Sequence, residues 1–290
     1  MIGLRILVIG SNGQLGRTLM SIGKVGFDVL GAQRDVSGLG REYIDLDIQD
    51  WSAIEQIFSD MRPEVVINSA AMTDVDACER NPEMATSVNA DAPRKIAEAC
   101  NIIGARMIQV STDYIFDGKE GMYDEDSPPS PIQEYGRTKL EGERGAIEVL
   151  GRDLTIVRPS VVFSNLTKNF VSWIVDSLVK GERLRIVNDQ FVTPTSTNFL
   201  AESIFELIKR KESGVWNICS SDRLSRFEMA TIVADTIGKG GASILPIKMD
   251  DLGWNAERPM DSSLDCGKSI PIVGEQTFRE MMNVLFVNAG

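Results

Sequence analysis

Short apolar runs alternate with longer amphipathic stretches through the first half of the chain. The runs are rich in valine, isoleucine and leucine, which is typical of parallel strands that are buried on both faces. The stretches between them carry apolar residues at helical spacing. Strands separated by helices predict a doubly wound parallel sheet of the Rossmann type, and therefore an α/β fold. The predicted strands are 4–9, 27–32, 42–44, 64–68, 105–110, 154–158 and 214–218, and the clearest predicted helices between them are 50–60, 92–103 and 135–150.

The rhythm changes after Pro159, where strands and helices no longer alternate regularly. An irregular segment with one short strand covers 183–195, and a loop-rich stretch leads to Pro271. We therefore predict a Rossmann domain over 1–160 and a smaller, mixed lobe over 161–290, with about 196–220 returning to the first domain. The helices predicted in this part of the chain are 169–180, 198–210, 226–237 and 275–285.

The composition is that of an ordinary globular protein, with 43% apolar and 25% charged residues in a chain of 290. No apolar run approaches the roughly 18 residues that span a bilayer, so no membrane partner is expected. The opening apolar run leads directly into a glycine-rich turn, which indicates a first strand rather than a secretory leader. We therefore expect a cytoplasmic protein. The formal net charge of -12 argues against nucleic acid as a partner.

The chain contains no histidine and four widely spaced cysteines. The missing histidine excludes catalysis by Ser-His-Asp or Cys-His groups and removes the commonest ligand of transition metals. Without a secretory leader or a CxxC pair, the cysteines are expected to be reduced thiols, and no metal site is predicted. Acid–base chemistry near neutral pH must therefore use tyrosine, lysine, a carboxylate or cysteine.

A glycine-rich turn with the spacing GxxGxxG follows the first predicted strand and opens a helix. Glycine permits close approach of the backbone to a ligand, and a helix N-terminus offers amide donors to a pyrophosphate. Three glycines so close together also occur in purely structural turns. At the first strand–helix junction of an alternating α/β chain, however, the pattern favours a dinucleotide site. The expected contacts are Gly10, Asn12, Gly13, Gln14, Leu15 and Gly16.

The end of the second predicted strand indicates which dinucleotide is bound. An acidic residue there would hydrogen-bond the ribose diol of NAD, but this strand ends in Arg34. Arg17 directly follows the last glycine of the turn. Two guanidinium groups near the ribose suit the 2'-phosphate of NADP. The alternative interpretation is that both arginines are ordinary surface residues. The favoured cofactor is NADP(H).

Tyr135 and Lys139 form a YxxxK pair on a predicted helix. Residues at i and i+4 share a helix face, so the phenol and the ammonium group should lie on one wall. An ordinary tyrosine has a pKa of about 10, and a nearby cation favours its phenolate. Thr112 and Asp113 follow a central strand, at the edge where open α/β sheets bind ligands. Small residues after another strand, Ser69 to Ala71, would allow a nicotinamide ribose to approach closely.

These features follow the order found in short-chain dehydrogenases/reductases, and the chain resembles the extended members, most of all the dTDP-4-dehydrorhamnose reductase family. The resemblance runs through nearly the whole chain. Its most specific blocks are Ala-Ala-Met-Thr-Asp-Val-Asp at 70–76, Ser-Thr-Asp-Tyr-Ile-Phe-Asp-Gly at 111–118, Tyr-Gly-Arg-Thr-Lys-Leu-Glu-Gly-Glu at 135–143, Asn-Asp-Gln-Phe at 188–191 with Pro194-Thr195, and Arg258-Pro259 with Ser262.

The resemblance implies hydride transfer from a nicotinamide to C4 of a nucleotide-linked 4-keto-6-deoxy sugar. Tyr135 would protonate the forming alkoxide, and Lys139 would lower the tyrosine pKa and bind the nicotinamide ribose. Thr112 would hydrogen-bond the carbonyl oxygen, so these three are the expected catalytic residues. The lobe over 161–290 would bind the substrate.

Further binding residues are matched position by position. Asp45 and Leu46 would lie near the adenine. For Asp45, and also for Asn89, the alternative interpretation is an ordinary surface or capping residue. Asn89 would order the active site, and Ala70, Ala71 and Thr73 would also contact the cofactor. Arg258 is the expected partner of the nucleotide diphosphate. The substrate-binding residues implied by the resemblance are Thr73, Asp113, Tyr114, Asn169, Gln190 and Arg258.

The chain departs from the family pattern after the sixth strand. The reductases usually carry a tryptophan against the sugar there, whereas this chain reads Arg-Pro-Ser-Val-Val-Phe over 158–163. The family also includes dimers bridged by Mg, whose ligands have no match here. The partner implied is therefore a nucleotide sugar, a homodimer is an assembly that the family allows, and no metal is expected.

Three alternatives stay open. A 4,6-dehydratase would carry a glutamate after Thr112-Asp113, where this chain has Tyr114. A sugar-nucleotide epimerase uses the same tyrosine and lysine without releasing oxidised cofactor. The stretch 258–266 also resembles the regulatory subunit of methionine adenosyltransferase, an NADP-binding protein that keeps a Tyr-Lys pair, so a non-catalytic role is the third alternative.

Overall fold

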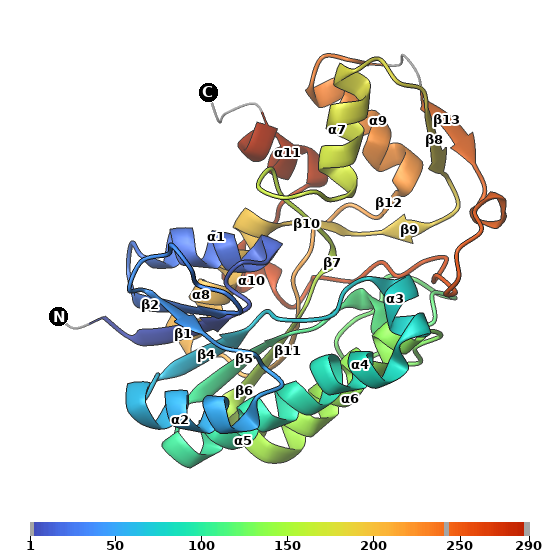
Figure 1. Cartoon of the computed structure of the whole chain (residues 1–290). Helices are drawn as coiled ribbons and strands as arrows, with labels where there is room; N and C mark the ends of the chain where they lie inside the picture. Colours follow the sequence, from blue (N-terminus) through green and yellow to red (C-terminus); the bar gives the residue numbers. More distant parts are fainter. Residues whose placement is uncertain (1–2, 241–243, 287–290) are drawn as a thin grey trace.

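The computed structural model describes residues 3–240 and 244–286, and its centre is a seven-stranded parallel sheet. The strand order is β11-β6-β5-β4-β1-β2-β3 (Figure 1). The first strand, β1, lies inside the sheet, and the later strands are added from it toward both edges. This is the order of a Rossmann sheet, so the predicted fold is confirmed. The strands are β1 (Arg5–Ile9), β2 (Asp28–Gln33), β3 (Tyr43–Asp45), β4 (Val65–Asn68), β5 (Arg106–Val110), β6 (Leu154–Arg158) and β11 (Gly214–Asn217).

The sheet separates two hydrophobic cores because successive side chains of a strand point to opposite faces. In β1, Ile6 and Val8 belong to one core, and Leu7 and Ile9 belong to the other. The first core is covered by α1 and α8, and the second by α2, α5 and α6. These helices are α1 (Gln14–Gly23), α2 (Trp51–Met61), α5 (Ala92–Ile103), α6 (Glu134–Leu150) and α8 (Thr197–Arg210).

The C-terminal lobe lies at one end of the sheet and contains helices with three pairs of short strands (Figure 1). Strand β10 pairs with β7, β12 with β9, and β13 with β8. The lobe elements are β7 (Ser160–Phe163), α7 (Phe170–Val179), β8 (Leu184–Val187), β9 (Phe191–Val192), β10 (Pro194–Ser196), β12 (Leu224–Ser225), α9 (Arg226–Thr236), β13 (Ile244–Ile247), α10 (Ile270–Val273) and α11 (Phe278–Phe286).

Several features of this part differ from the prediction: β12, β13 and α10 were not predicted, and two further differences have a clear cause. Helix α11 begins at Phe278 rather than near 275 because Thr277 and Glu280 cap its first turn: the Thr277 amide donates to the Glu280 carboxylate at 2.8 Å. Strand β7 was not predicted, since its ladder partner β10 lies more than thirty residues further along the chain.

Short helical elements connect the large sheet to the site. They are α3 (Val75–Arg80), α4 (Pro82–Thr86), a π-helical turn η1 (Ser87–Asp91), and the 3₁₀ turns η2 (Asp113–Ile115), η3 (Gly151–Asp153) and η4 (Met249–Asp251). A π-helical turn opens the regular hydrogen-bond ladder and is frequent near functional sites. Across 3–240 and 244–286, no helix has the length and apolar content needed to cross a membrane.

A buried ion pair joins helix α6 to the end of strand β6. The Arg158 guanidinium donates to both oxygens of Glu143, at 3.0 and 2.7 Å, and the two side chains are only 5% and 2% exposed. Arg158 also lies over the ring of Phe116, 5.7 Å from its centroid. Because the pair sits one helical turn from Lys139, it fixes the helix that carries the predicted YxxxK residues.

Candidate active site

A cleft of about 820 Å³ opens where the carboxyl ends of the strands meet the C-terminal lobe. This is the edge at which open α/β sheets bind ligands. Most of the predicted site residues line this cleft together, although they come from five separate parts of the chain. They are Gly10, Asn12, Gly13, Gln14, Leu15, Arg34, Ala70, Ala71, Thr73, Thr112, Asp113, Tyr114, Tyr135 and Lys139.

The glycine-rich turn is built so that a ligand can approach its backbone. Gly10 has a φ of +82°, and a Cβ there would lie 2.7 Å from the amide nitrogen of Ala70. A Cβ on Gly16 would overlap the Gly10 carbonyl oxygen, so this glycine lets α1 start close against the turn. The N-cap residue Gly13 has no side chain to bond the first amides of α1. Those amides therefore fit a pyrophosphate.

The two predicted arginines are in different positions. Arg34 is exposed and lines the cleft just beyond β2. Arg17 does not line it, and its Nε donates to the Asn12 carbonyl at 2.9 Å. Arg34 thus lies on the cleft wall, whereas Arg17 supports the turn.

Asp45 and Leu46, the residues expected near the adenine, come just before the stretch that lines the cleft. Leu46 is buried in the second core, and the Asp45 carboxylate accepts from the Asp35 amide at 3.3 Å. Neither lines the cleft, but 47–49 do. Strand β3 ends at Asp45, and the loop that reaches the cleft begins only after it. Because ligands bind beyond the carboxyl ends of the strands, the strand end points to Asp47 rather than Asp45.

Tyr135 and Lys139 lie in the first turns of α6 and face the cleft. The Lys139 Nζ donates to the Val110 carbonyl at 2.6 Å, which holds the ammonium group at the end of β5. The Tyr135 ring packs edge to face on Tyr114 with centroids 6.0 Å apart. Helix α6 starts here because Gln133 caps it, accepting from the Gly136 amide at 2.6 Å.

Burial shifts the pKa of both groups toward their neutral forms. It raises the pKa of Tyr135, with the Thr112 hydroxyl acting in the opposite direction. It lowers the pKa of Lys139 to about 8, and only the nearby Glu143 carboxylate raises it. The raised tyrosine pKa differs from the expectation that Lys139 would lower it. A phenol with a raised pKa is protonated at neutral pH but is a weaker acid than a free tyrosine, so it gives its proton only to a strongly basic oxygen such as a forming alkoxide.

Asp113 is held by the protein itself. Its carboxylate is fully buried and accepts from the hydroxyls of Ser160, Ser262 and Thr112 at 2.7, 2.6 and 3.1 Å. Burial raises the pKa of this carboxyl, and the three hydroxyl donors act against that. Asp113 therefore joins the end of β5 to β7 and the C-terminal segment, and its oxygens are already engaged where a sugar contact was expected.

Besides Gly16, Arg17, Asp45 and Leu46, four more predicted residues do not line the cleft. The Asn169 side chain caps α7, accepting from the Ser172 amide at 3.1 Å. Buried Gln190 donates to the Tyr114 hydroxyl at 3.5 Å, and Arg258 forms an ion pair with Asp76. Asn89, in the π-helical turn, accepts from the Met72 amide at 2.9 Å and donates to its carbonyl at 3.0 Å. These residues position cleft-lining neighbours rather than forming its wall.

Sequence reasoning missed several cleft residues, of which Lys168, Val161 and Arg226 carry the most information. Val161 occupies the place where a tryptophan was expected, and it has a φ of +42°. Such a conformation is an outlier for a β-branched residue, and strained residues cluster at functional sites. Within the described residues, no group of three or more Cys, Asp or Glu side chains is placed to hold a metal ion.

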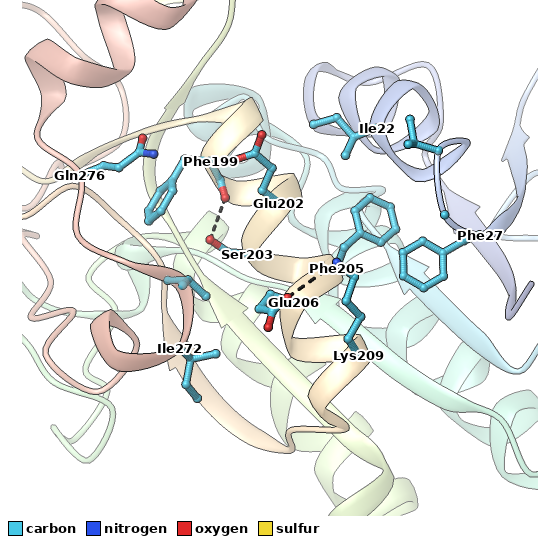
Figure 2. Close-up of a pocket in the computed structure, with 13 residues that line it drawn as sticks. Ile22, Phe27, Phe199, Glu202, Ser203, Phe205, Glu206, Lys209, Ile272 and Gln276 are labelled. Atoms are coloured by element: carbon cyan, nitrogen blue, oxygen red, sulfur yellow. Dashed lines mark hydrogen bonds and ion pairs between the residues drawn. The ribbon is translucent and has the colours of Figure 1, made fainter.

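A second cavity, of about 690 Å³, lies between α1, α8 and α10 (Figure 2). Its wall includes the stacked rings of Phe27 and Phe205, 5.1 Å apart, and the paired side chains of Glu206 and Lys209. None of the predicted site residues lines it. The cleft at the strand ends is therefore the candidate active site.

The chain is similar along most of its length to several known proteins. A dTDP-4-dehydrorhamnose reductase of Streptomyces griseus is 35% identical over 267 residues, covering 90% of this chain and 85% of the relative. Methionine adenosyltransferase 2 subunit beta of Xenopus tropicalis is 30% identical over 301 residues, covering 95% and 84%. The crystal structure of a Bacillus anthracis dTDP-4-dehydrorhamnose reductase in complex with NADP superposes with a TM-score of 0.89 at 28% identity, covering 99% of both chains.

The family described as RmlD substrate binding domain matches residues 4–285, which is nearly the whole chain and includes both the Rossmann sheet and the lobe. The chain belongs to this family.

Proposed function

We propose that this protein is an NADP(H)-dependent oxidoreductase that reduces the 4-keto group of a nucleotide-linked 4-dehydro-6-deoxy sugar. Its activity is of the dTDP-4-dehydrorhamnose reductase kind, and deoxysugar or polysaccharide precursor synthesis is the route we infer for it. The observation that carries the proposal is the placement of Tyr135, Lys139 and Thr112 in the same cleft as an open phosphate-binding turn.

The cleft residues fit the cofactor. The turn from Gly10 to Gly16 and the first amides of α1 would hold the pyrophosphate, and Arg34 would hold the 2'-phosphate. Asp47 would lie near the adenine. When bound, the nicotinamide supplies the hydride that reduces the carbonyl carbon.

The protein's own residues manage the proton. Tyr135 donates its phenolic proton to the carbonyl oxygen as that oxygen becomes an alkoxide. Thr112 lies beside the phenol, and its hydroxyl, which donates to Asp113 when no substrate is present, would turn to the same oxygen to position it. The Lys139 ammonium group, anchored on the Val110 carbonyl, stabilises the tyrosinate that is left behind.

The alternative of a non-catalytic NADP-binding subunit has one observation in its favour, the similarity to methionine adenosyltransferase 2 subunit beta. NADPH oxidation against a panel of nucleotide-linked 4-keto sugars tests the proposed function, with intact-mass analysis of copurified ligand beside it. Turnover on one of the sugars supports the reductase. A protein that binds NADP but turns over none of them would be the regulatory binder, and isomerisation without net NADPH oxidation would indicate an epimerase.

Replacing Arg34 with aspartate should shift the cofactor preference from NADPH toward NADH by about 10- to 100-fold. The reason is the loss of charge-assisted hydrogen bonds to the 2'-phosphate and the gain of a carboxylate that suits a ribose diol. The measurement is the ratio of kcat/KM for the two cofactors. Arg17→Ala is the matched control, since Arg17 lies outside the cleft. An unchanged ratio in R34D would place the 2'-phosphate elsewhere.

The pH dependence of kcat/KM should follow Lys139. The pKa of Lys139 is about 8, so the ammonium group is charged below that pH and neutral above it. The rate of reduction should therefore be level near pH 7 and fall about tenfold per pH unit above pH 8. In Lys139→Arg the charge persists, because the guanidinium pKa is above about 12, so the fall should disappear below pH 10. A fall at the same pH in both proteins would exclude Lys139 as its source.

A further inference from the structure

Arg226 is a charged cleft residue to which no role has yet been given. It is the first residue of α9, and it lines the cleft from the lobe side. Its charge acts on the buried groups of the active site, lowering the pKa of Asp113 and Tyr114 against the larger effect of burial. Arg226 therefore lies close to the catalytic side chains without belonging to the Tyr-Lys pair.

The Arg226 guanidinium group is held through its Nε, while its two terminal nitrogens are not engaged by the described residues. Its Nε donates to the Gln190 Oε1 at 3.2 Å, and its backbone amide donates to the Gln190 carbonyl at 3.1 Å. The guanidinium lies over the Phe170 ring, 5.0 Å from the centroid. Across 3–240 and 244–286, neither Nη1 nor Nη2 of Arg226 has a hydrogen-bond or ion-pair partner. The planar guanidinium is thus held in place by Gln190 and Phe170, on a residue that lines the cleft, with its two outer donors free to bind a ligand.

Neighbouring arginines of the lobe are already neutralised. Arg258 donates to both oxygens of Asp76, at 3.3 and 3.0 Å, and to the Ala256 carbonyl at 2.8 Å, and it does not line the cleft. Arg223 is paired with Asp261. Arg226 has no acidic partner of this kind in the described chain, so its charge is available to a ligand.

The N-terminus of α9 does not compete for the same ligand. Ser225 caps the helix, accepting from the Glu228 amide at 3.1 Å, while the Glu228 carboxylate accepts from the Ser225 amide at 2.7 Å. This reciprocal cap occupies amide donors of the first turn and adds a negative charge there. Anion binding at this wall would therefore depend on the guanidinium itself.

We propose that Arg226, braced by Gln190 and Phe170, binds the diphosphate of the nucleotide-linked substrate, the role expected for Arg258. This inference rests on the proposed function. A guanidinium fork matches phosphate oxygens in a bidentate manner. In such a substrate one sugar ring separates C4 from the anomeric oxygen that carries the diphosphate, so the diphosphate group lies across the ring from the reacting carbonyl. Tyr114 spans the corresponding interval: its ring contacts Tyr135, and its hydroxyl meets Gln190, which in turn bonds Arg226.

Binding of nucleoside diphosphates to the NADPH-saturated protein tests this assignment without any turnover. The probes are dTDP, UDP and GDP, with the corresponding nucleosides for comparison, measured by titration calorimetry. Arg226→Met keeps the length of the side chain and removes the fork, and it should weaken binding of the preferred diphosphate by about 10- to 100-fold. Affinity for the nucleoside and for NADPH should stay within about twofold. Arg226→Lys keeps the charge without the fork, so its loss should be intermediate.

Arg223→Met is the matched control, because it removes a positive charge from the same segment outside the cleft. It should bind the diphosphate as the unmodified protein does. Wild-type affinity in R226M would overturn the assignment of Arg226, while the proposed function would stand. Equal losses of diphosphate affinity in R223M and R226M would show that any nearby positive charge has the same effect, and this result would also overturn the assignment of Arg226. Failure of the unmodified protein to bind any of the three diphosphates would overturn both the inference and the proposed substrate class.

Discussion

Replacing Tyr135 with phenylalanine should lower kcat by at least about 100-fold and leave the affinity for NADPH almost unchanged. General acid catalysis by a positioned side chain is worth about 10²- to 10⁴-fold, and the chain contains no histidine to take over the proton. The phenol is buried, and its raised pKa keeps it protonated until an alkoxide forms beside it. The phenylalanine ring keeps the packing against Tyr114, so the cleft should retain its shape.

Steady-state kinetics on the sugar that the panel identifies, together with NADPH titration, would measure this effect. Tyr114→Phe is the matched control, since it removes a phenolic hydroxyl from the same cleft and should cost less than about tenfold. If Y135F turned over at the unmodified rate, Tyr135 would not be the proton donor. Equal losses in the two variants would indicate general damage to the cleft.

Replacing Glu143 with alanine should destabilise the protein by about 3–5 kcal/mol, because it leaves the Arg158 guanidinium buried without a counter-charge. The desolvation cost of that charge is not recovered by hydrogen bonds elsewhere, and Nη1 of Arg158 already lacks a partner within the described residues. A large fall in the midpoints of thermal and urea unfolding would measure the effect.

Two comparisons isolate the buried charge as the cause. Glu141→Ala removes an acid from the same helix, but the ion pair of Glu141 with Arg137 is solvent-exposed, so its loss should cost less than about 1 kcal/mol. The double variant with Glu143→Leu and Arg158→Met replaces the pair with apolar side chains and should recover much of the stability. A small effect of E143A would show that water or a rearranged side chain compensates Arg158.

The large sheet was predictable because its signals are local. Each of its strands ends within one residue of the predicted position, since the apolar runs are short and bounded by turn residues. The glycine turn and the Tyr135–Lys139 pair were equally readable, because both depend on spacing within one element. The small strands of the lobe were predicted only in part: one short strand was expected over 183–195, where β8 lies, but β7 was missed because its partner β10 is distant in sequence.

The site was less predictable where a residue's partner decides its role. The family resemblance pointed to Arg258 and not to Arg226, but only the folded structure shows that Arg258 is already paired with Asp76, 182 residues away. Asp113 was matched to a sugar contact, but Ser160 and Ser262 occupy its oxygens. No pattern within one element contains this information, because the charges and hydroxyls involved meet only after folding.

The backbone strain at Val161 changes what a substitution in the cleft costs in stability. Changes that reshape a binding pocket usually lower stability, so a new specificity often requires a compensating change elsewhere. At Val161 a substitution can instead raise the stability. A β-branched residue in the left-handed region carries about 1–2 kcal/mol of strain, and glycine or asparagine would relieve it. Among the described residues that line the cleft, Val161 is therefore a position where a substitution would change the shape of the pocket and also relax the backbone.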